Sequence, residues 1–208
     1  LEEHLYEGAL IALDSNRCVK VHFTVSPEHK NLFREHVEKA VPSMEEKLGV
    51  HFEISFSEQK SNTDTIAATP DNEPFRNADG SLLFRPGGHG ALIENLNEID
   101  ADVIFIKNID NIVPARLMPD TVVYKKLLAG KLVALQNQIF EYLEELDCGM
   151  PDENRLQEML SFLETELWCL RPEGGDLSGI ELADYLYCKF NRPLRVCGMV
   201  KNVGEAGG

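Results

Sequence analysis

The stretch that decides the fold covers residues 84–111. It contains the turn Arg85-Pro86-Gly87-Gly88-His89-Gly90 and, further on, Asp102-Val103-Ile104-Phe105-Ile106-Lys107-Asn108-Ile109-Asp110-Asn111. Glycine lacks a Cβ atom, so a turn this rich in glycine lets the backbone approach a ligand closely. A helix that begins near Ala91 would direct unpaired N–H groups toward an anion. The apolar run at 102–106 predicts a strand, and open α/β sheets bind ligands where such strands end. The two segments predict a βαβ-like unit and nucleotide chemistry.

Composition narrows the class of protein and of partner. The 208 residues, 43% hydrophobic and 26% charged, suit a soluble globular protein with one substantial core. We find no apolar run long enough to cross a bilayer, so we expect no membrane partner and a cytoplasmic location. The net charge of −15 argues against a nucleic-acid partner, which needs many Lys and Arg contacts to phosphate. The sequence leaves the oligomeric state open.

Residues 1–118 predict an α/β region. Its expected elements are, in order, helix 5–13, strand 18–25, a helix that starts at Ser26-Pro27-Glu28, strand 50–56, helix 91–97 and strand 102–106. Pro42 is expected to interrupt or kink the second helix. Between residues 57 and 83 the chain is polar and rich in turn residues, which predicts a long connection across the rim of the sheet.

Residues 119–191 predict a helical segment, inserted into the α/β domain or packed beside it as a lobe. Helical spacing covers residues 122–146, 154–170 and 177–190. Residues 192–208 then return to the sheet as a strand at 194–200 and a glycine-rich loop. The predicted fold is therefore α/β, with a mostly parallel sheet and a helical insertion or lobe.

The glycine turn supplies the first candidate binding residues. Gly87, Gly88 and Gly90 would let the backbone contact a ligand, and His89 between them would donate to a phosphate, a base or a sugar hydroxyl. Arg85 could clamp the same anion, or form an ordinary surface ion pair. A tight connection that uses glycine for its geometry alone is the alternative for the whole turn.

The end of the predicted strand at 102–106 supplies candidate catalytic residues. Asp110 is the best single candidate for a Mg²⁺ ligand, because Mg²⁺ prefers one or two carboxylates with phosphate oxygens and water. Asn108 and Asn111 flank it as candidate substrate contacts, and Lys107 could neutralise phosphate charge or face solvent. The alternative is a turn in which Asp110 and Asn111 only bond the backbone.

Two further residues are candidates for ligand binding. Gln59 follows the predicted strand 50–56, where its amide could read a base, although a surface loop explains it equally well. Lys201 lies in the last glycine-rich segment and could face a substrate.

The order of these motifs resembles a known enzyme class. Phe56-Ser57-Glu58-Gln59, Asp79-Gly80, the glycine turn and Asn108-Ile109-Asp110-Asn111 follow one another as in UDP-sugar pyrophosphorylases, which are nucleotidyltransferases of the glycosyltransferase-A type fold. Residues 84–111 and 195–208 resemble more closely a bacterial family that is labelled only as a domain of unknown function. The likeness covers about the first half of the chain and its tail.

The resemblance implies a Rossmann-like fold and a function. It implies that Gly87, Gly88, His89 and Gly90 contact a uracil with Gln59 near the base, and that Asp110 and Asn111 lie by the ribose, the phosphates and Mg²⁺. A sugar 1-phosphate would attack the α-phosphorus of the nucleotide and pyrophosphate would leave.

One departure from the pyrophosphorylases qualifies the implied activity. Their opening strand and glycine-rich phosphate loop have no counterpart ahead of Leu13. We therefore expect either a piece of a larger protein that lacks the amino-terminal half of the site or a family that has lost the chemistry, and in both cases a poor catalyst as it stands. The rival hypothesis is a non-catalytic module that binds a nucleotide sugar, or a protein partner through residues 119–191.

Overall fold

The chain forms two compact units. The computed structural model describes residues 1–171, 175, 177–198 and 203–204, and the side chain of His89 lies outside the description. Unit 1 is Leu1–Val122 and unit 2 is Val123–Gly208, so the division falls within helix α4 (Met118–Cys148). No helix in the described ranges combines the length and the apolar character that a membrane span requires.

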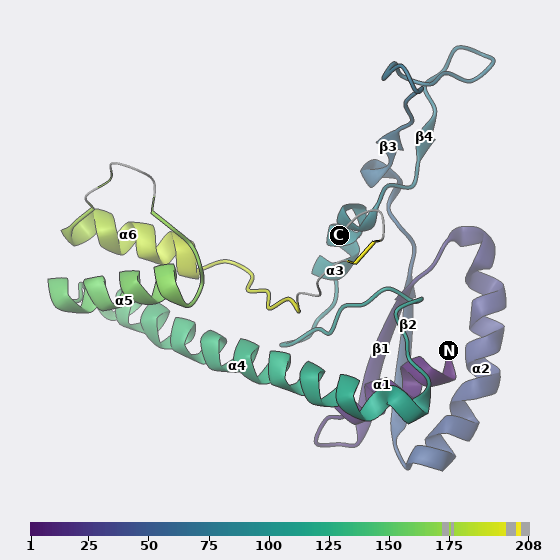
Figure 1. Ribbon diagram of the computed structural model, residues 1–208, viewed down its shortest axis with the longest axis horizontal. Helices are drawn as coiled ribbons and strands as arrows, with labels where there is room; N and C mark the ends of the chain where they lie inside the picture. The colour runs from purple at the N-terminus through teal and green to yellow at the C-terminus, as the bar shows by residue number, and fades with distance from the viewer. Residues whose placement is uncertain (172–174, 176, 199–202, 205–208) are drawn as a thin grey trace. The chain divides into compact units, whose positions relative to one another are not determined.

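A pair of parallel strands forms the centre of unit 1. Strands β1 (Cys18–Thr24) and β2 (His51–Ser57) lie side by side, with Val19 opposite Phe52 and Thr24 opposite Ser57 (Figure 1). Both strands lie close to their predicted positions, and the mixed α/β class with parallel strands is confirmed. Side chains alternate between the two faces of such a pair, so Val19, Val21 and Phe23 share one face and His22 and Thr24 the other.

Two helices cover the apolar face of this pair. Helix α1 (Glu2–Ile11) approaches β1 so closely that a Cβ at Gly8 would lie 3.2 Å from Cγ1 of Val19. Helix α2 (Pro27–Leu48) begins with Pro27 at its first position and ends at Gly49, whose φ of 63° is left-handed. Side chains from both helices and both strands form the core of unit 1, among them Leu5, Val19, Met44, Val50 and Phe52.

Pro42 does not interrupt α2. The helix continues through it to Leu48, although proline has no N–H for the bond to the preceding turn. Val37 and Met44 on either side of Pro42 are buried, and we infer that this packing offsets the missing hydrogen bond.

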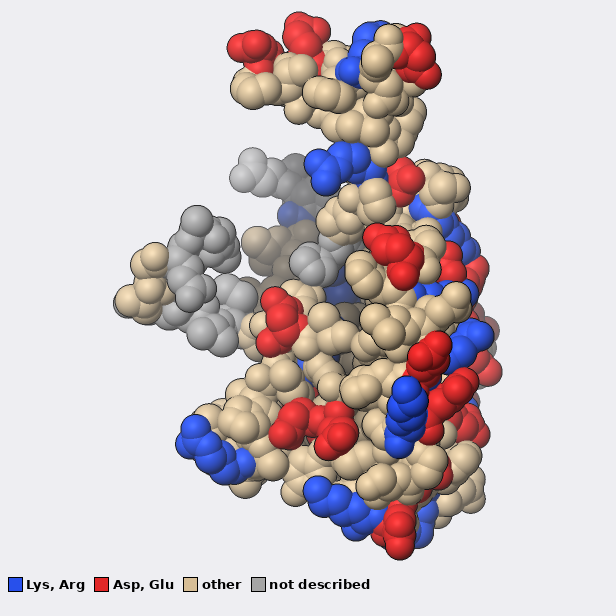
Figure 2. All heavy atoms as spheres, turned by 90° about the vertical axis from the view of Figure 1, so that its right-hand side faces the viewer, with Lys and Arg blue, Asp and Glu red and all other residues tan. Residues whose placement is uncertain are grey.

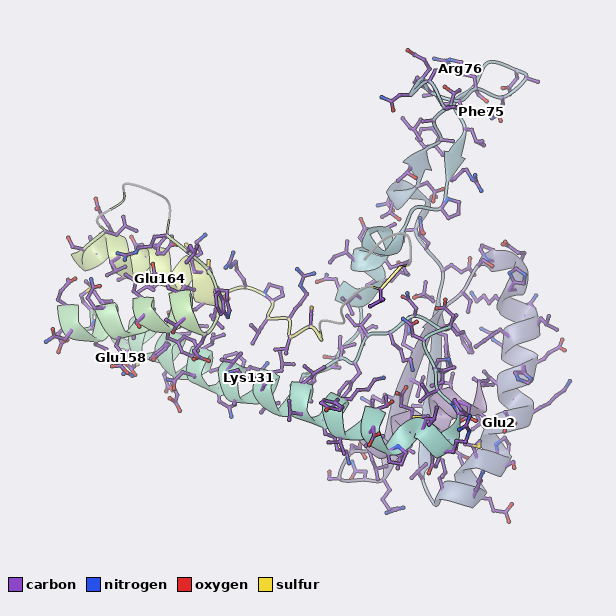
Figure 3. All side chains as sticks on the ribbon, viewed as in Figure 1. Glu2, Phe75, Arg76, Lys131, Glu158 and Glu164 are labelled. Carbon is purple, nitrogen blue, oxygen red and sulfur yellow. The ribbon has the colours of Figure 1, made fainter. Side chains whose placement is uncertain are left out.

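Most of the expected long connection is a hairpin. After the short helix η1 (Ser61–Thr63), strands β3 (Thr65–Ile66) and β4 (Phe84–Arg85) pair antiparallel, and the bridges Ala68 to Pro74 and Arg76 to Leu82 extend the pairing. Gly80, with a left-handed φ of 83°, lies in the turn that follows Asp79. The hairpin projects from the rest of unit 1, with Phe75 and Arg76 on its outer part (Figure 3).

The helix expected from Ala91 is shorter than predicted. Helix η2 (His89–Leu92) leads into α3 (Ile93–Asn97), which has only five residues. A helix of this length has too few aligned peptides for a strong dipole, so the predicted anion site at its N-terminus loses that support.

The strand predicted at 102–106 is not found, because these residues pair with no other described segment. The prediction rested on a continuous apolar run, which does not by itself distinguish a paired strand from an extended segment. Described residues 194–198 likewise form no strand, and residues 199–202, with Lys201, lie outside the description. A wider Rossmann-like sheet is therefore not confirmed. Helix η3 (Ala115–Leu117) leads from this region into α4.

Unit 2 is a helical cluster. Helices α5 (Glu153–Thr165) and α6 (Gly179–Phe190) pack against each other and against the later turns of α4 (Figure 1). Asp152 caps α5 by accepting a hydrogen bond from the backbone N–H of Arg155 at 2.9 Å. The buried core consists of Ile139, Tyr142, Leu156, Met159, Leu160, Leu163, Leu182, Ala183, Leu186 and Phe190. The helices predicted from periodicity are all present, and α5 ends five residues earlier than expected.

Candidate functional site

A network of polar side chains occupies the carboxyl ends of β1 and β2. Nδ1 and Nε2 of His22 each contact a hydroxyl at 2.8 Å, on Ser55 and Ser57 respectively. The hydroxyls of Thr24 and Ser57 lie 3.2 Å apart. Burial lowers the pKa of His22, because a charged imidazolium would lose solvation here. The carboxyl edge of the parallel pair is therefore polar on the face opposite α1 and α2.

Asn95 of α3 extends this network to the segment that follows the glycine turn. Its side chain is 2% exposed, and its Nδ2 donates to Oγ of Ser57 at 2.9 Å and to the carbonyl of Glu58 at 2.8 Å. Its Oδ1 has no hydrogen-bond partner among the residues described. Asn95 thus fixes α3 to the end of β2 by its nitrogen alone.

Gln59 and the glycine turn meet the same short loop. Gln59 donates to Oδ1 of Asp64 at 3.1 Å, and a Cβ on Gly87 would lie 3.1 Å from Cγ2 of Thr65. The same Cβ would lie 3.4 Å from the carbonyl oxygen of Thr63, so only glycine fits without displacing a neighbour. The structure brings Gln59 and Gly87 together through residues 63–65.

The other two glycines of the turn face open space. A Cβ at Gly88 or at Gly90 would meet no atom of the described residues within 4 Å. Gly88 has φ of −67° and ψ of −171°, an extended conformation that any residue adopts. Neither packing nor backbone conformation in the structure therefore requires glycine at position 88.

Arg85 lies at the end of β4 on the surface. It is exposed, and among described residues it forms no ion pair, in contrast to the surface pairing considered as its alternative. On the face drawn in Figure 2, acidic and basic side chains are interspersed and no broad basic patch gathers.

Lys107 is held by helix α1. Its Nζ lies 2.6 Å from Oε2 of Glu7, whose side chain is only 3% exposed, and Nε2 of His4 donates to the carbonyl of Ile109 at 2.8 Å. Desolvation by burial is the main cause that lowers the pKa of His4. These contacts tie the segment to α1 by side chains, in place of the strand pairing that was expected.

Residues 108–111 form a turn that is closed by the backbone. The N–H of Asn111 donates to the carbonyl of Asn108 at 3.2 Å, and the N–H of Ile112 donates to that of Asp110 at 3.0 Å. Asn108, Asp110 and Asn111 are all exposed. Their side chains are therefore accessible to a ligand.

The glycine turn and residues 107–111, the two predicted halves of the site, are held by different elements of unit 1. Asn95 binds Ser57 on the polar face of the strand pair, whereas Lys107 binds α1, which covers the apolar face. Between described groups, no hydrogen bond or ion pair joins residues 108–111 to the glycine turn. Within the described part of the chain, the structure thus groups Gln59 with Gly87 of the turn, and no contact between described residues joins Lys107 or Asp110 to them.

A metal site built by protein alone is not seen. No three His, Cys, Asp or Glu side chains in the described part of the chain gather closely enough to hold an ion. Asp110 offers one exposed carboxylate, which fits Mg²⁺ only when phosphate oxygens complete the coordination.

Sequence reasoning missed Asn95, His22 and Ser57. A signal was present for Asn95, because it takes a place among Leu92, Leu96 and Ile99 at helical spacing, where an apolar residue is expected. His22 and Ser57 gave no such signal, since their contact depends on the register between β1 and β2.

Comparison with known proteins gives one finding. Searches of curated proteins and of solved structures returned no match to this chain. The family described as "Domain of unknown function (DUF4301)" matches residues 1–208. The chain therefore belongs to the DUF4301 family.

Proposed function

We propose that unit 1 binds a uridine nucleotide or a nucleotide sugar, as a nucleotidyltransferase-like domain of an enzyme that acts on sugar 1-phosphates. The observation that carries the proposal is the glycine turn, in which Gly88 and Gly90 face open space beside the loop that Gln59 contacts. The similarity of this order of motifs to UDP-sugar pyrophosphorylases supports the choice of a uracil base and of a Rossmann-like fold.

The packing of the turn supports a binding role over a purely geometric one. Close contact with residues 63–65 accounts for the glycine at position 87. No contact between described residues, and no feature of the backbone, accounts for the glycine at position 88. A ligand that lies against the backbone at position 88 would require a residue without a side chain. The exposed amide of a residue such as Gly88 is also a suitable donor to a base or a phosphate.

Asp110 is the residue that we propose for Mg²⁺. Its exposed carboxylate would share the ion with the phosphates of the nucleotide, and Mg²⁺ when bound would neutralise their charge. Lys107, which is paired with Glu7, would hold the segment that carries Asp110 in place. In this proposal Asn108 and Asn111 offer amides to the ribose or the phosphates.

The test measures binding by titration calorimetry with UTP and UDP-glucose, each with and without Mg²⁺. Gly88→Val should abolish binding without unfolding unit 1, because the backbone at this position accepts any residue and the space is open. Gly130→Ala on α4, where an added Cβ also meets no atom of the described residues within 4 Å, is the control and should bind normally. Wild-type protein that binds neither nucleotide at millimolar concentration would refute the proposal.

Two further variants separate the parts of the site. Gln59→Ala should weaken binding whether or not Mg²⁺ is present, whereas Asp110→Asn should remove only the Mg²⁺-dependent part. If Asp110→Asn leaves the Mg²⁺ effect intact while Gly88→Val abolishes binding, the nucleotide assignment stands and the metal assignment is wrong.

A second candidate function is a protein-interaction module. The observation that favours it is a cluster of exposed apolar side chains on α4, where Val123, Tyr124 and Leu127 are 61%, 69% and 64% exposed. Their spacing places these three side chains on one face of the helix. Contiguous apolar patches on the surface of a soluble protein often mark sites of interaction with another protein. Light scattering tests whether the protein self-associates through this face, since Leu127→Glu should then yield a monomer. If Leu127→Glu and the wild type have the same mass, the hypothesis of self-association through this face is wrong.

A further inference from the structure

We propose that Asn95 is a positioning residue that holds Gln59 and the glycine turn in one fixed arrangement. The inference rests on the proposed function, since it concerns how the same site is assembled. No sequence motif points to this role. It follows from the contacts of one buried side chain.

The two contacts of Asn95 join the two loops of the site. The carbonyl that accepts from Nδ2 belongs to Glu58, the residue directly before Gln59. Asn95 itself lies five residues beyond Gly90, on the short helix that continues from the glycine turn. One amide group therefore spans from the end of β2 to the segment that carries the turn.

Besides the backbone pairing of β3 with β4 and the packing of Gly87, the other side-chain ties between these loops are exposed. Nδ2 of Asn62 lies 3.2 Å from a carboxylate oxygen of Glu94, and Lys60 pairs with Glu94 at 3.8 Å and, more closely, with Glu98. Exposed pairs of this kind contribute little to stability, because water and salt compete for both partners. Among these side-chain ties, the buried amide of Asn95 is the one that water weakens least.

The orientation of the Asn95 amide is fixed by its neighbours. Turned over, it would place Oδ1 against the carbonyl oxygen of Glu58, which cannot donate. The observed orientation leaves Oδ1 buried without a partner among described residues, which costs about 1–3 kcal/mol. An apolar side chain would avoid this cost, so packing alone does not account for an asparagine here.

The first test compares Asn95→Ala with Asn97→Ala by titration calorimetry with UDP-glucose. Both substitutions remove the same amide from the same helix, but Asn97 is exposed. Asn95→Ala loses two hydrogen bonds, so its affinity for UDP-glucose should fall roughly tenfold or more. Asn97→Ala should bind UDP-glucose as the wild type does. Ser57→Ala removes one of the two acceptors and should give a smaller loss than Asn95→Ala. Equal affinities for both asparagine variants would overturn the proposal.

The second test needs no ligand, so it separates this inference from the proposed function. Amide hydrogen exchange reports the N–H of Ala91, which donates to Gly88, and that of Thr63, which donates to Lys60. In Asn95→Ala both amides should exchange faster, while the amides of β1 and β2 keep their protection. If exchange at both loops is unchanged, Asn95 does not position them, whether or not a nucleotide binds. If exchange rises but the wild type binds no nucleotide, the positioning role stands and only the proposed function fails.

Discussion

The two units differ in what they bury. Unit 2 has a core of apolar side chains from three helices and one buried hydroxyl without a described partner, that of Tyr185. Both buried polar or charged residues of the described chain, Glu7 and Asn95, lie in unit 1. All six histidines of the sequence also lie in unit 1. A buried polar group is costly unless it is bonded, so its presence indicates a constraint other than packing. The comparison teaches that unit 1 is the half in which to look for chemistry, and that unit 2 is stabilised mainly by apolar burial.

The largest effects should come from a matched pair of core substitutions. Leu5→Ala in unit 1 and Leu163→Ala in unit 2 each truncate a leucine that is 0% exposed. Each should lower the free energy of unfolding by about 2–5 kcal/mol, through lost apolar burial and the cavity that remains. Hydrogen exchange measured along the chain should show faster exchange in the substituted unit only. Equal loss of protection in both units would mean that they unfold together.

A second comparison sets a buried ion pair of unit 1 against an exposed pair of unit 2. Lys107→Met leaves the nearly buried carboxylate of Glu7 without this partner, and should cost roughly 2–3 kcal/mol. Lys131→Met breaks the pair with Glu166, in which both side chains are about half exposed, and should cost less than about 1 kcal/mol. Chemical denaturation of both variants measures the difference (Lys131 is labelled in Figure 3). Similar costs would show that the burial of Glu7 has no energetic consequence.

Acid should destabilise unit 1 selectively. Burial lowers the pKa of His22 in the folded state, so below the ordinary histidine value of 6.5 the unfolded chain binds more protons than the folded one. The contribution of neutral His22 to stability is therefore present above that value and is lost as the pH falls toward the folded-state pKa. Denaturation from pH 7.5 to 5 should show this loss, and His22→Gln should reduce its slope. A slope that His22→Gln leaves unchanged would assign the loss to other groups.

The smallest expected effect is a gain in the free energy of unfolding. Gly130→Ala places a methyl group in open space within α4, and should raise the free energy of unfolding by about 0.5–1 kcal/mol, because glycine loses more conformational freedom in a helix. Gly87→Ala, the contrasting change in unit 1, should destabilise, since its Cβ would lie 3.1 Å from Thr65. Thermal melting of the two variants should therefore shift in opposite directions.

Local signals in the sequence predicted most of the elements. Apolar spacing identified α4, α5 and α6, and the Ser26-Pro27 signal matched the observed start of α2. These features depend on neighbours within a few residues along the chain. The two strands of the pair were also predicted, and residues 50–56 alternate between apolar and polar side chains as a strand does.

Features that depend on distant parts of the chain were not predicted. The segment at 102–106 has the composition of a strand, but side-chain contacts from His4 and Glu7, about 100 residues earlier, hold its end. The hairpin of β3 and β4 pairs residues about 20 apart through a polar stretch that lacks strand alternation. In the candidate site, the glycines and Gln59 were visible as a motif, whereas Asn95 acquires its meaning only from the folded end of β2.

The hairpin that carries Phe75 leaves backbone donors and acceptors along its outer edges, together with the exposed side chains of Ile66 and Phe84. Such edges recruit strands from other molecules and so promote aggregation in concentrated solution. Pro70 and Pro74 lack the N–H that an added strand would need, and the charges of Asp71 and Glu73 repel a second copy of the same edge. Replacing these residues with strand-forming ones should therefore raise the tendency of the hairpin to pair with other molecules.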